Sequence, residues 1–584
     1  MKHYFRLALA STILLLFHSA RAQEVEQGET LAKPVVAPSD SGLYRGVNQL
    51  PVSIRRSAPF ARALNEMTKR AGTSGTFDEE ARVRAFEQSR RDLTQTAISA
   101  ARKSGGGDRP LDNSAWTNIG LIPSSSSPYV YSAGCTTALA VDPVNTNIVY
   151  AGATSGGVWK STDKGAHWVS LTDDIIPNQS VASIAIDPKN HNTIYVGTGN
   201  GYASIDELTG TGLYKSEDGG GTWSRIGASS LTGTIVKVFV DPVHSNVILA
   251  SSYTSNRGLY RSTDSGATWS KIYAAAQPIW DITGSTSVLY FVEGNNPNSS
   301  SSECGVYKSQ NEGASWNKTG TASLPPGDSI GRCALASSVK HPERVYVLIA
   351  NPDGNENGAS RSLFLSANSG LNWSAISIPS TLFIAANPAP QGWYDCTLAV
   401  SPNSSSGADT IVIAGIEAYI DYSDGTGWNQ FSGSGDPTTW SYEPHVDHHS
   451  FAFDPVDPTI MYDGDDGGVY WSQDAGYDWS YRSNQMVTSR MYHMSLDRSS
   501  SDNKTALVGL QDQGTWSLTY PLGATTFLFG GDGIQPIYNS QYSSTYPYYT
   551  EIAGGPIYRY HHLGNYWDEV DTGSDNSNWD TPFQ

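Results

Sequence analysis

An eight-residue pattern, Ser-x-Asp-x-Gly-x-x-Trp, recurs along the chain and constrains its fold more than any other sequence feature. Clean copies of this octet occupy residues 161–168, 216–223, 262–269 and 472–479. Copies with Asn in place of Asp occupy 309–316 and 366–373, and a degenerate copy ends at Trp428. Successive octet tryptophans lie 46 to 57 residues apart, a period typical of propellers and other repeat architectures.

Each period contains the same order of short β-prone runs. In the first complete unit these runs cover residues 136–141, 147–153, 157–161 and 168–171. Four short strands joined by tight turns within one repeat are typical of a blade of an antiparallel propeller. The composition, with 57 glycines and 11% aromatic residues among 584, also favours turn-rich β structure. We therefore predict an all-β fold, a seven-bladed β-propeller over residues 109–482.

The octet has a structural role in this prediction. It joins the third and fourth strands of a blade, where Gly165 and its equivalents supply the positive φ that a tight hairpin needs. Asp163 accepts backbone N–H groups within the turn, and Ser161 reinforces it. Trp168 begins the fourth strand and is expected to wedge between blades. We predict no catalytic role for these residues.

The octets resemble the Asp-box (BNR repeat) of sialidases, of sortilin ectodomains and of the xyloglucanases of glycoside hydrolase family 74. The resemblance implies a seven-bladed ring, and residues 116–120 resemble a fourth strand that would close this ring by pairing with the last blade. Family 74 enzymes contain two tandem propellers. Residues 483–584 hold further blade-like units, which either begin an incomplete second propeller or complete the single ring.

The N-terminal region differs from the repeats. Lys2 and Arg6 precede an apolar run, and small residues close the segment 1–22, which is typical of a cleaved signal peptide. Residues 23–108 are predicted to be a linker and helical spacer, with a helix over 78–103. No later run is long enough to span a bilayer. The mature protein is therefore expected to be secreted or periplasmic.

Charge and cysteine content limit the partners and the redox chemistry. Residues 1–109 hold 17 Lys and Arg against 11 Asp and Glu, whereas the remainder holds 20 against 45. The acidic repeat region should repel nucleic acid and suits neutral or cationic partners or metal ions. The four cysteines follow no zinc-binding spacing, so either disulfides or buried thiols are expected. They are Cys135, Cys304, Cys333 and Cys396.

Strand order predicts which face of the propeller carries the function. The octets lie on the face of the 3–4 turns, so longer loops on the opposite face should form the site. Those loops include residues 392–395, 445–449, 463–468 and 511–514, which form an acidic sector with histidines and aromatics.

One hypothesis for this sector is glycoside hydrolysis, in which two carboxylates flank the scissile bond. We predict Asp465 and Asp512 as the catalytic carboxylates. Family 74 places its base in an Asp-x-Gly-Gly turn of the first blade, where this chain has Thr154, whereas residues 465–468 keep that pattern in the seventh blade. The predicted substrate-binding residues, which would contact a polysaccharide or cell-surface glycan, are Trp393, Tyr394, Asp395, Trp440 and Tyr442.

Two other hypotheses remain open. His445, Asp447 and His449 alternate, so on an extended segment they would point to one side and could bind a divalent metal ion. The alternative is a non-catalytic, sortilin-like propeller that binds a protein, peptide or glycan at its mouth. Sialidase activity is disfavoured because the chain lacks the Arg-Ile-Pro segment of those enzymes.

Overall fold

The computed structural model describes residues 133–571 with several gaps. The gaps are positions 174, 178, 202–207, 254–255, 287, 298, 353–361, 384–390, 404–406, 433–441, 497–504, 520–523, 531–532, 534–535, 539–547, 552–556 and 562–565. The predicted signal peptide (1–22), the spacer (23–108) with its helix, and the strand at 116–120 lie outside the described residues.

The described residues form nine four-stranded antiparallel sheets, each made of four consecutive strands. Sheets 1 to 3 contain β1 (Thr136–Val141), β2 (Val149–Ala153), β3 (Val158–Ser161), β4 (Val169–Ser170), β5 (Val181–Ile186), β6 (Ile194–Thr198), β7 (Leu213–Ser216), β8 (Ser224–Ile226), β9 (Ile235–Val240), β10 (Ile248–Ser252), β11 (Gly258–Ser262) and β12 (Ser270–Tyr273). Sheets 4 to 6 contain β13 (Ile279–Gly284), β14 (Leu289–Glu293), β15 (Gly305–Ser309), β16 (Asn317–Thr319), β17 (Cys333–Ser337), β18 (Val345–Ile349), β19 (Ser362–Ser366), β20 (Ser374–Ile376), β21 (Thr397–Val400), β22 (Ile411–Ala414), β23 (Ala418–Asp421) and β24 (Asn429–Gln430).

The remaining elements follow the same order. Sheets 7 to 9 contain β25 (His448–Phe453), β26 (Met461–Asp465), β27 (Gly468–Ser472), β28 (Ser480–Tyr481), β29 (Met491–Leu496), β30 (Thr505–Leu510), β31 (Gly514–Thr519), β32 (Ala524–Phe529), β33 (Ile537–Tyr538), β34 (Tyr548–Glu551), β35 (Ile557–His561) and β36 (Tyr566–Asp571). A short 3₁₀ helix, η3 (Gly327–Ser329), precedes sheet 5. In the described part of the chain, no helix has the length and apolar character needed to cross a bilayer.

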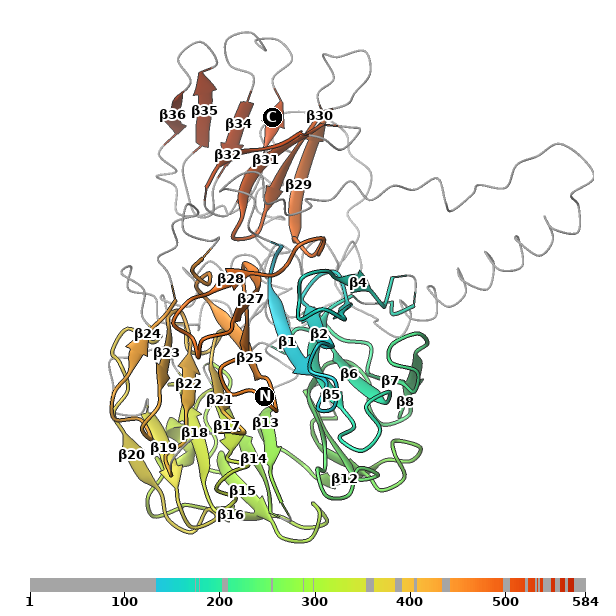
Figure 1. Cartoon of the computed structure of the whole chain (residues 1–584), viewed down its shortest axis with the longest axis vertical. Coiled ribbons are helices and arrows are strands. Elements are labelled where there is room, and N and C mark those ends of the chain that lie inside the picture. The colour runs from blue at the N-terminus through green and yellow to red at the C-terminus, as the bar shows by residue number, and fades with distance from the viewer. Residues whose placement is uncertain are drawn as a thin grey trace, which may run out of the picture. The chain divides into compact units, whose positions relative to one another are not determined.

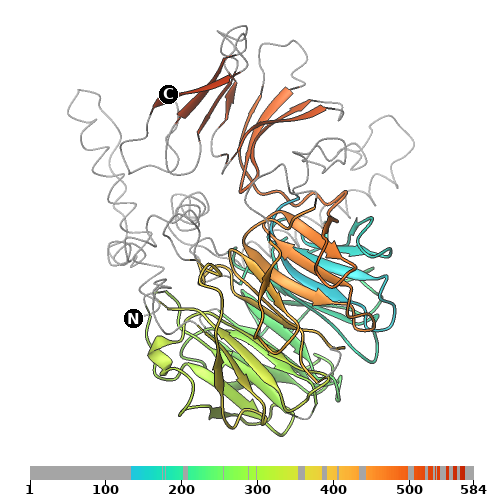
Figure 2. The same ribbon diagram turned by 60° about the vertical axis from the view of Figure 1, so that its left-hand side comes forward.

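The first strands of sheets 1 to 7 contact one another in a closed circuit. β1 contacts β5, and the series continues through β9, β13, β17 and β21 to β25, which returns to β1 (Figures 1 and 2). Beyond this ring, β29 of sheet 8 contacts β33 of sheet 9. The all-β propeller of four-stranded antiparallel units expected from the sequence is therefore confirmed.

Burial follows the position of a strand within its sheet. The second strands β2, β6 and β18 are buried along their whole length, whereas the fourth strands β8 and β20 have no buried residue. This pattern explains the apolar second strands, because each is covered on both faces by neighbouring sheets.

Glycines in some second strands allow adjacent sheets to approach closely. A Cβ at Gly152 would lie 2.4 Å from Val181 of sheet 2, and a Cβ at Gly464 would lie 2.9 Å from the Thr136 carbonyl oxygen of sheet 1. Both glycines face the first strand of the next sheet in the ring. Packing at these two positions therefore leaves no room for a side chain.

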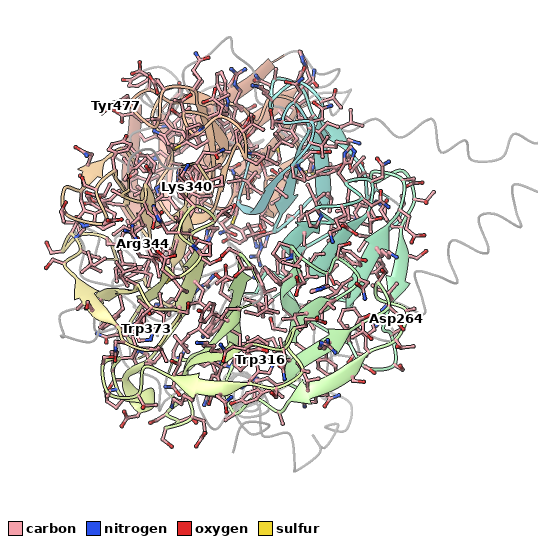
Figure 3. All side chains as sticks on the ribbon, turned by 60° about the horizontal axis from the view of Figure 1, so that its bottom comes forward. Asp264, Trp316, Lys340, Arg344, Trp373 and Tyr477 are labelled. Carbon is pink, nitrogen blue, oxygen red and sulfur yellow. The ribbon has the colours of Figure 1, made fainter. Side chains whose placement is uncertain are left out.

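The octets fold as turns held by their own polar side chains. In the first octet, Gly165 donates its N–H to Ser161 Oγ at 2.8 Å, and Ser161 Oγ lies 2.8 Å from Asp163 Oδ1. The N–H of His167 also binds Asp163 Oδ1, at 2.9 Å. Gly165 has a φ of 84°, which confirms the predicted role of this glycine. Figure 3 labels residues from four of these turns, which lie at different positions around the ring.

The octet tryptophans pack between neighbouring sheets, as predicted. Trp269 joins an apolar cluster of sheets 2 and 3, Trp316 one of sheets 3 and 4, and Trp479 one of sheets 6 and 7. Trp168 packs in the cluster between sheets 7 and 1, and its indole N–H donates to the carbonyl oxygen of Arg482.

The ring closes without strand exchange among the described residues. All four strands of sheet 7 come from one continuous segment. The seam between sheets 7 and 1 is joined instead by the N–H of Ala133, which donates to the Gly467 carbonyl oxygen at 2.8 Å, and by Thr488, whose hydroxyl donates to the Ala133 carbonyl oxygen. The four cysteines are buried and none of them forms a disulfide, so of the two alternatives left open by the sequence, the structure has buried thiols.

Candidate functional site

The candidate site is formed by loops of sheets 6 and 7, on the face opposite the octets. The segment before β21 carries Tyr394 and Asp395, the segment before β25 carries Asp447, β25 carries His449, and the β26–β27 turn carries Asp466. These five residues are called the Asp395 cluster below. The strand order predicts this convergence, because the loops into first strands and the turns between second and third strands share one face.

Two carboxyl groups of the cluster are paired. Asp395 has no exposed surface, and the negative charge of the half-buried Asp447 acts on its carboxyl. Within the described part of the chain, neither oxygen of Asp395 has a hydrogen-bond partner. Burial, followed by the negative charges of Asp447 and Asp466, raises the pKa of Asp395 well above its ordinary value. Both effects favour the protonated form of Asp395.

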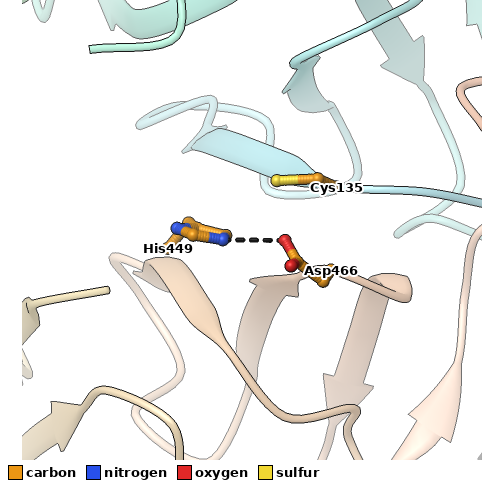
Figure 4. Close-up of side chains that lie close together, drawn as sticks. All are labelled: Cys135, His449 and Asp466. Carbon is orange, nitrogen blue, oxygen red and sulfur yellow. Dashed lines mark hydrogen bonds and ion pairs between the residues drawn. The ribbon is translucent and has the colours of Figure 1, made fainter. Parts of the chain in front are cut away.

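Asp466 connects the cluster to a histidine, a tyrosine and a cysteine. Its Oδ1 lies 2.8 Å from His449 Nε2, and its Oδ2 accepts the Tyr394 hydroxyl at 3.1 Å. The Tyr394 and His449 rings pack edge to face, with centroids 5.0 Å apart. Figure 4 shows Cys135 of sheet 1 opposite His449 and Asp466 of sheet 7, and one ligand atom from each of the three lies within 4.8 Å of the others.

This triplet has two chemical capabilities. A thiol beside a histidine that is held by a carboxylate can be activated as a nucleophile. The same sulfur, nitrogen and oxygen atoms could bind a transition metal ion. Cys135, however, is only 6% exposed, so a polymeric substrate could not reach its sulfur without movement of the surrounding loops.

Two further side chains hold the cluster in place. Gln391 donates its amide N–H to Asp447 Oδ1 at 3.0 Å. Arg332 donates to the backbone carbonyl oxygen of Tyr394 at 2.9 Å, and its positive charge partly opposes the rise in the pKa of Asp395. The guanidinium also lies over the ring of Trp280, 5.4 Å from the centroid. These contacts fix the loop that carries Tyr394 and Asp395.

Asp465, predicted as a catalytic carboxylate, caps a turn. Its Oδ1 accepts the backbone N–H groups of Gly467 and Gly468, each at 2.9 Å, and the residue has no exposed surface. Burial and the nearby Asp463 raise the pKa of Asp465 well above its ordinary value. The Asp-x-Gly-Gly pattern therefore has a local structural function in this turn.

Asp512, the other predicted carboxylate, lies in the β30–β31 turn of sheet 8 and is half-buried. It accepts a hydrogen bond from the Gln511 amide at 2.8 Å. Its negative charge acts on His445, whose pKa is nevertheless lowered, because burial outweighs all other effects. Asp512 of sheet 8 thus interacts electrostatically with His445, which lies in the loop that leads to Asp447.

The predicted sugar-stacking aromatics differ in exposure. Trp393 and Tyr394 are each 3% exposed, and their rings lie 6.0 Å apart, which leaves little ring surface for a sugar. Tyr442 is 56% exposed. Trp440 lies outside the described residues.

The predicted metal trio is split between different environments. β25 begins only at His448, and Asp447 has a φ of 65°, so residues 445–449 are not one extended strand and their side chains do not alternate. His445 Nδ1 contacts the Val446 carbonyl oxygen, whereas His449 contacts Asp466. Within the described ranges, the groups that could hold an ion are Cys135–His449–Asp466 and His448–Asp463–Asp465.

Sequence reasoning overlooked several residues of this site. Asp466 was visible only as part of an acidic turn, and Gln391 and Arg332 carry no motif. Cys135 is separated from His449 by more than 300 residues of sequence. Its position at the site follows from ring closure, which a linear pattern does not reveal.

The comparisons with known proteins agree with this fold. The family model for sortilin (neurotensin receptor 3) matches residues 211–370. Solved structures with similar folds include a family 74 enzyme of Niastella koreensis, with 16% identity, a TM-score of 0.50, and coverage of 76% of this chain and 73% of that one. The family 74 xyloglucanase of Xanthomonas campestris matches with 17% identity, a TM-score of 0.50, and coverage of 75% and 74%.

An ancestral family 74 enzyme has 16% identity and a TM-score of 0.53, with coverage of 78% of this chain and 63% of that one. No curated protein matches the sequence. The predicted resemblance to sortilin-type and family 74 Asp-box propellers is therefore confirmed as a likeness of fold.

Proposed function

We propose that this chain is an exported Asp-box propeller that hydrolyses extracellular polysaccharide, with Asp447 and Asp512 as the carboxylates that act on the glycosidic bond. The single observation that supports this proposal is the buried Asp395 beside the half-buried Asp447. Two adjacent carboxyl groups cannot both ionise easily, so such a pair favours retention of a proton. A glycoside hydrolase needs a protonated acid of this kind.

In this mechanism Asp447 is the general acid. Its partner Asp395 shares the proton, and Gln391 orients the carboxyl from the other side. Transfer of the proton to the glycosidic oxygen leaves a negative charge on the pair, which the nearby Arg332 stabilises. Asp512, from sheet 8, is the second carboxylate and activates the attacking water as a base. Asp465 is assigned to the turn and not to the chemistry.

The second candidate is a propeller that binds a glycan, peptide or protein without hydrolysis. The observations that favour it are Thr154 at the family 74 base position of sheet 1, which is 5% exposed, and the turn-capping role of Asp465. A binder needs only a rigid acidic surface. Export through the predicted signal peptide belongs to both candidates.

The test is a panel of xyloglucan and β-glucans with wild type, Asp447→Asn, Asp512→Asn and a control, Glu217→Gln. The control removes an exposed carboxylate that pairs with Lys215 at the end of β7. Loss of an acid or base should lower the hydrolysis rate by about 10²- to 10⁴-fold, with glycan retention preserved. Hydrolysis unchanged in either Asp variant would remove that assignment. Retention without hydrolysis in the wild type would select the binder. A wild type that neither hydrolyses nor retains any glycan would overturn the glycan proposal.

A further inference from the structure

A second polar cluster lies inside sheet 7, away from the Asp395 cluster. It consists of His448 on β25, Asp463 and Asp465 on β26, and Tyr470 on β27, and is called the sheet 7 cluster below. His448 pairs with Asp465 across the first two strands, and Asp463 pairs with Tyr470 across the next two. Asp463 and Asp465 are two residues apart on one strand, so these side chains share one face of the sheet.

The cluster is completely enclosed. His448, Asp463, Asp465 and Tyr470 each have no exposed surface. His448 Nδ1 lies 2.8 Å from Asp463 Oδ2, and one ligand atom from each of His448, Asp463 and Asp465 lies within 4.8 Å of the others. The three residues thus have the mutual spacing of ligands to a single ion.

Several atoms of the cluster lack a protein partner. Within the described part of the chain, Asp463 Oδ1, Asp465 Oδ2, His448 Nε2 and the Tyr470 hydroxyl make no hydrogen bond. Buried polar atoms are paired in most proteins, and an unpaired carboxylate oxygen is costly. Four such atoms in one place indicate that a group normally present between them completes the site.

Apolar side chains surround the sheet 7 cluster, which disfavours water as the partner of these unpaired polar atoms. The same face of sheet 7 packs against sheet 6 through an apolar cluster that contains Met461, Tyr470 and Trp479. The His448 ring stacks on Phe451, with centroids 5.9 Å apart, and meets Phe431 edge-on at 6.3 Å. Two carboxylates in such surroundings repel each other strongly unless a positive charge lies between them.

We propose that the sheet 7 cluster is a structural site for a divalent transition-metal ion of the zinc type, bound by His448, Asp463 and Asp465 with the Tyr470 hydroxyl adjacent. One imidazole and two carboxylates are suitable donors for zinc, which accepts nitrogen and oxygen ligands in a four-coordinate site. The ion neutralises both carboxylates and ties the first two strands of the seventh sheet together. This site is distinct from the predicted trio of His445, Asp447 and His449, and from the triplet that contains Cys135.

The experiment uses full-length protein expressed in medium supplemented with zinc chloride and, separately, in zinc-depleted medium. Because the cluster has no exposed atoms, the ion must enter during folding, so its occupancy is set during expression. Elemental analysis should find about one zinc per chain, and X-ray absorption should show only nitrogen and oxygen neighbours at about 2.0–2.2 Å. Zinc-loaded protein should melt at a higher temperature than zinc-depleted protein.

Two variants assign the ion to its site. In His448→Gln/Asp463→Asn, the zinc content should fall at least about tenfold, because loss of two of three protein ligands removes the site. In the control Cys135→Ser, it should stay at the wild-type value. The proposal is overturned by absence of stoichiometric zinc in the wild type, which would mean that a shared proton satisfies the carboxylates. A sulfur neighbour at about 2.3 Å would also overturn it, because it would place the ion at Cys135. Both of these outcomes are measured on the wild-type protein, so neither depends on whether a variant folds.

Discussion

Asp395 is an acid whose environment favours its neutral form, and its neighbours Asp447 and Asp466 add to that preference. The folded chain keeps this proton at pH values where the unfolded chain releases it. For an acid whose pKa is raised on folding, stability is greatest at low pH and falls as the pH rises above the unfolded value, here 3.8. The carboxyl pair thus lowers the stability of the protein at neutral pH, as expected of a functional group.

We predict that Asp395→Asn stabilises the protein at neutral pH. Asparagine has the shape of the protonated acid and can donate an N–H to Asp447, but it has no proton to lose. The melting temperature should rise by about 2–4 °C at pH 7, and this gain should disappear near pH 4. Melting curves of both proteins between pH 4 and 8 provide the measurement. A gain independent of pH would contradict the assigned protonation state.

Some residue roles could be inferred from sequence and others could not. The positive φ of Gly165 followed from its place in a hairpin, which is a local property. The role of Asp465 depended on whether its turn exposes or buries the carboxylate, which is decided by the packing of sheet 7 against its neighbours. His445, Asp447 and His449 alternate in sequence, but Asp447 has a positive φ and the strand begins only at His448.

At the scale of the element, the octet turn needs two consecutive residues with positive φ. The residue before the octet glycine also has positive φ: Lys164 has 59°, Ser265 has 59° and Ala475 has 64°, and in the second octet this position is Gly219, at 70°. Non-glycine residues pay a steric penalty in this conformation, and Ala lacks the polar side chain that lets Asn or Asp reduce it.

We therefore predict that Ala475→Gly raises the free energy of unfolding by about 0.5–1 kcal/mol. The conformational entropy that glycine adds to the unfolded chain reduces this gain. Gly219→Ala provides the reciprocal control and should lower it by a similar amount, because the nearest atom to a Cβ there would be the flexible end of Lys160, at 3.2 Å. Denaturant unfolding of both variants measures the effect. Changes of the same sign in the two variants would show that φ does not control the stability of this turn.

The elements themselves were the most predictable part of this chain. The octet marks the third and fourth strands of a sheet directly, and Asp-Pro pairs follow the end of the first strand at residues 142–143, 187–188, 241–242 and 454–455. In the degenerate copy, Asp421 replaces the serine and its Oδ1 accepts the N–H of Gly425 at 2.7 Å. The turn thus keeps its hydrogen bonds although the sequence pattern is lost. The spacing between repeats is therefore maintained at this position.

At the scale of the whole molecule, the seam between sheets 7 and 1 joins the two ends of the ring. The Trp269, Trp316 and Trp479 indoles donate to the glycine of their own octet. Trp168 and Trp428 instead donate across a junction between sheets, to the carbonyl oxygens of Arg482 and Ser377. The closure of the ring thus depends on side-chain packing and a few hydrogen bonds, whereas the strands inside each sheet have continuous backbone pairing.

We predict that Trp168→Phe loosens the seam specifically. The substitution removes one buried hydrogen bond and some apolar contact, which should cost about 1–3 kcal/mol. Hydrogen exchange should accelerate at the Ala133 amide, which bonds Gly467 across the seam. The matched control is Trp479→Phe, since Trp479 is 4% exposed and Trp168 3%, and it should leave that amide protected. If exchange of the Ala133 amide accelerates equally in both variants, Trp168 does not stabilise this seam specifically.

The sequence predicted the propeller, but not how distant parts of the chain meet in it. A repeat fixes the contacts within a sheet, because these involve neighbours in sequence. The proximity of Cys135 to His449 and the electrostatic effect of Asp512 on His445 depend on the curvature of the ring and on the position of sheet 8. Both arise from packing of complete sheets, and short patterns contain no information about them.

The correspondence between one chain segment and one complete sheet has a consequence for the history of such a protein. Because each sheet of the described residues is built from four consecutive strands, a duplication of one repeat delivers a self-contained unit with its own pairing intact. A ring can therefore gain a sheet, or a further unit such as sheet 8 can be added, without a change in the strand pairing of the existing sheets. Recombination at repeat boundaries would then be tolerated more readily than recombination within a repeat.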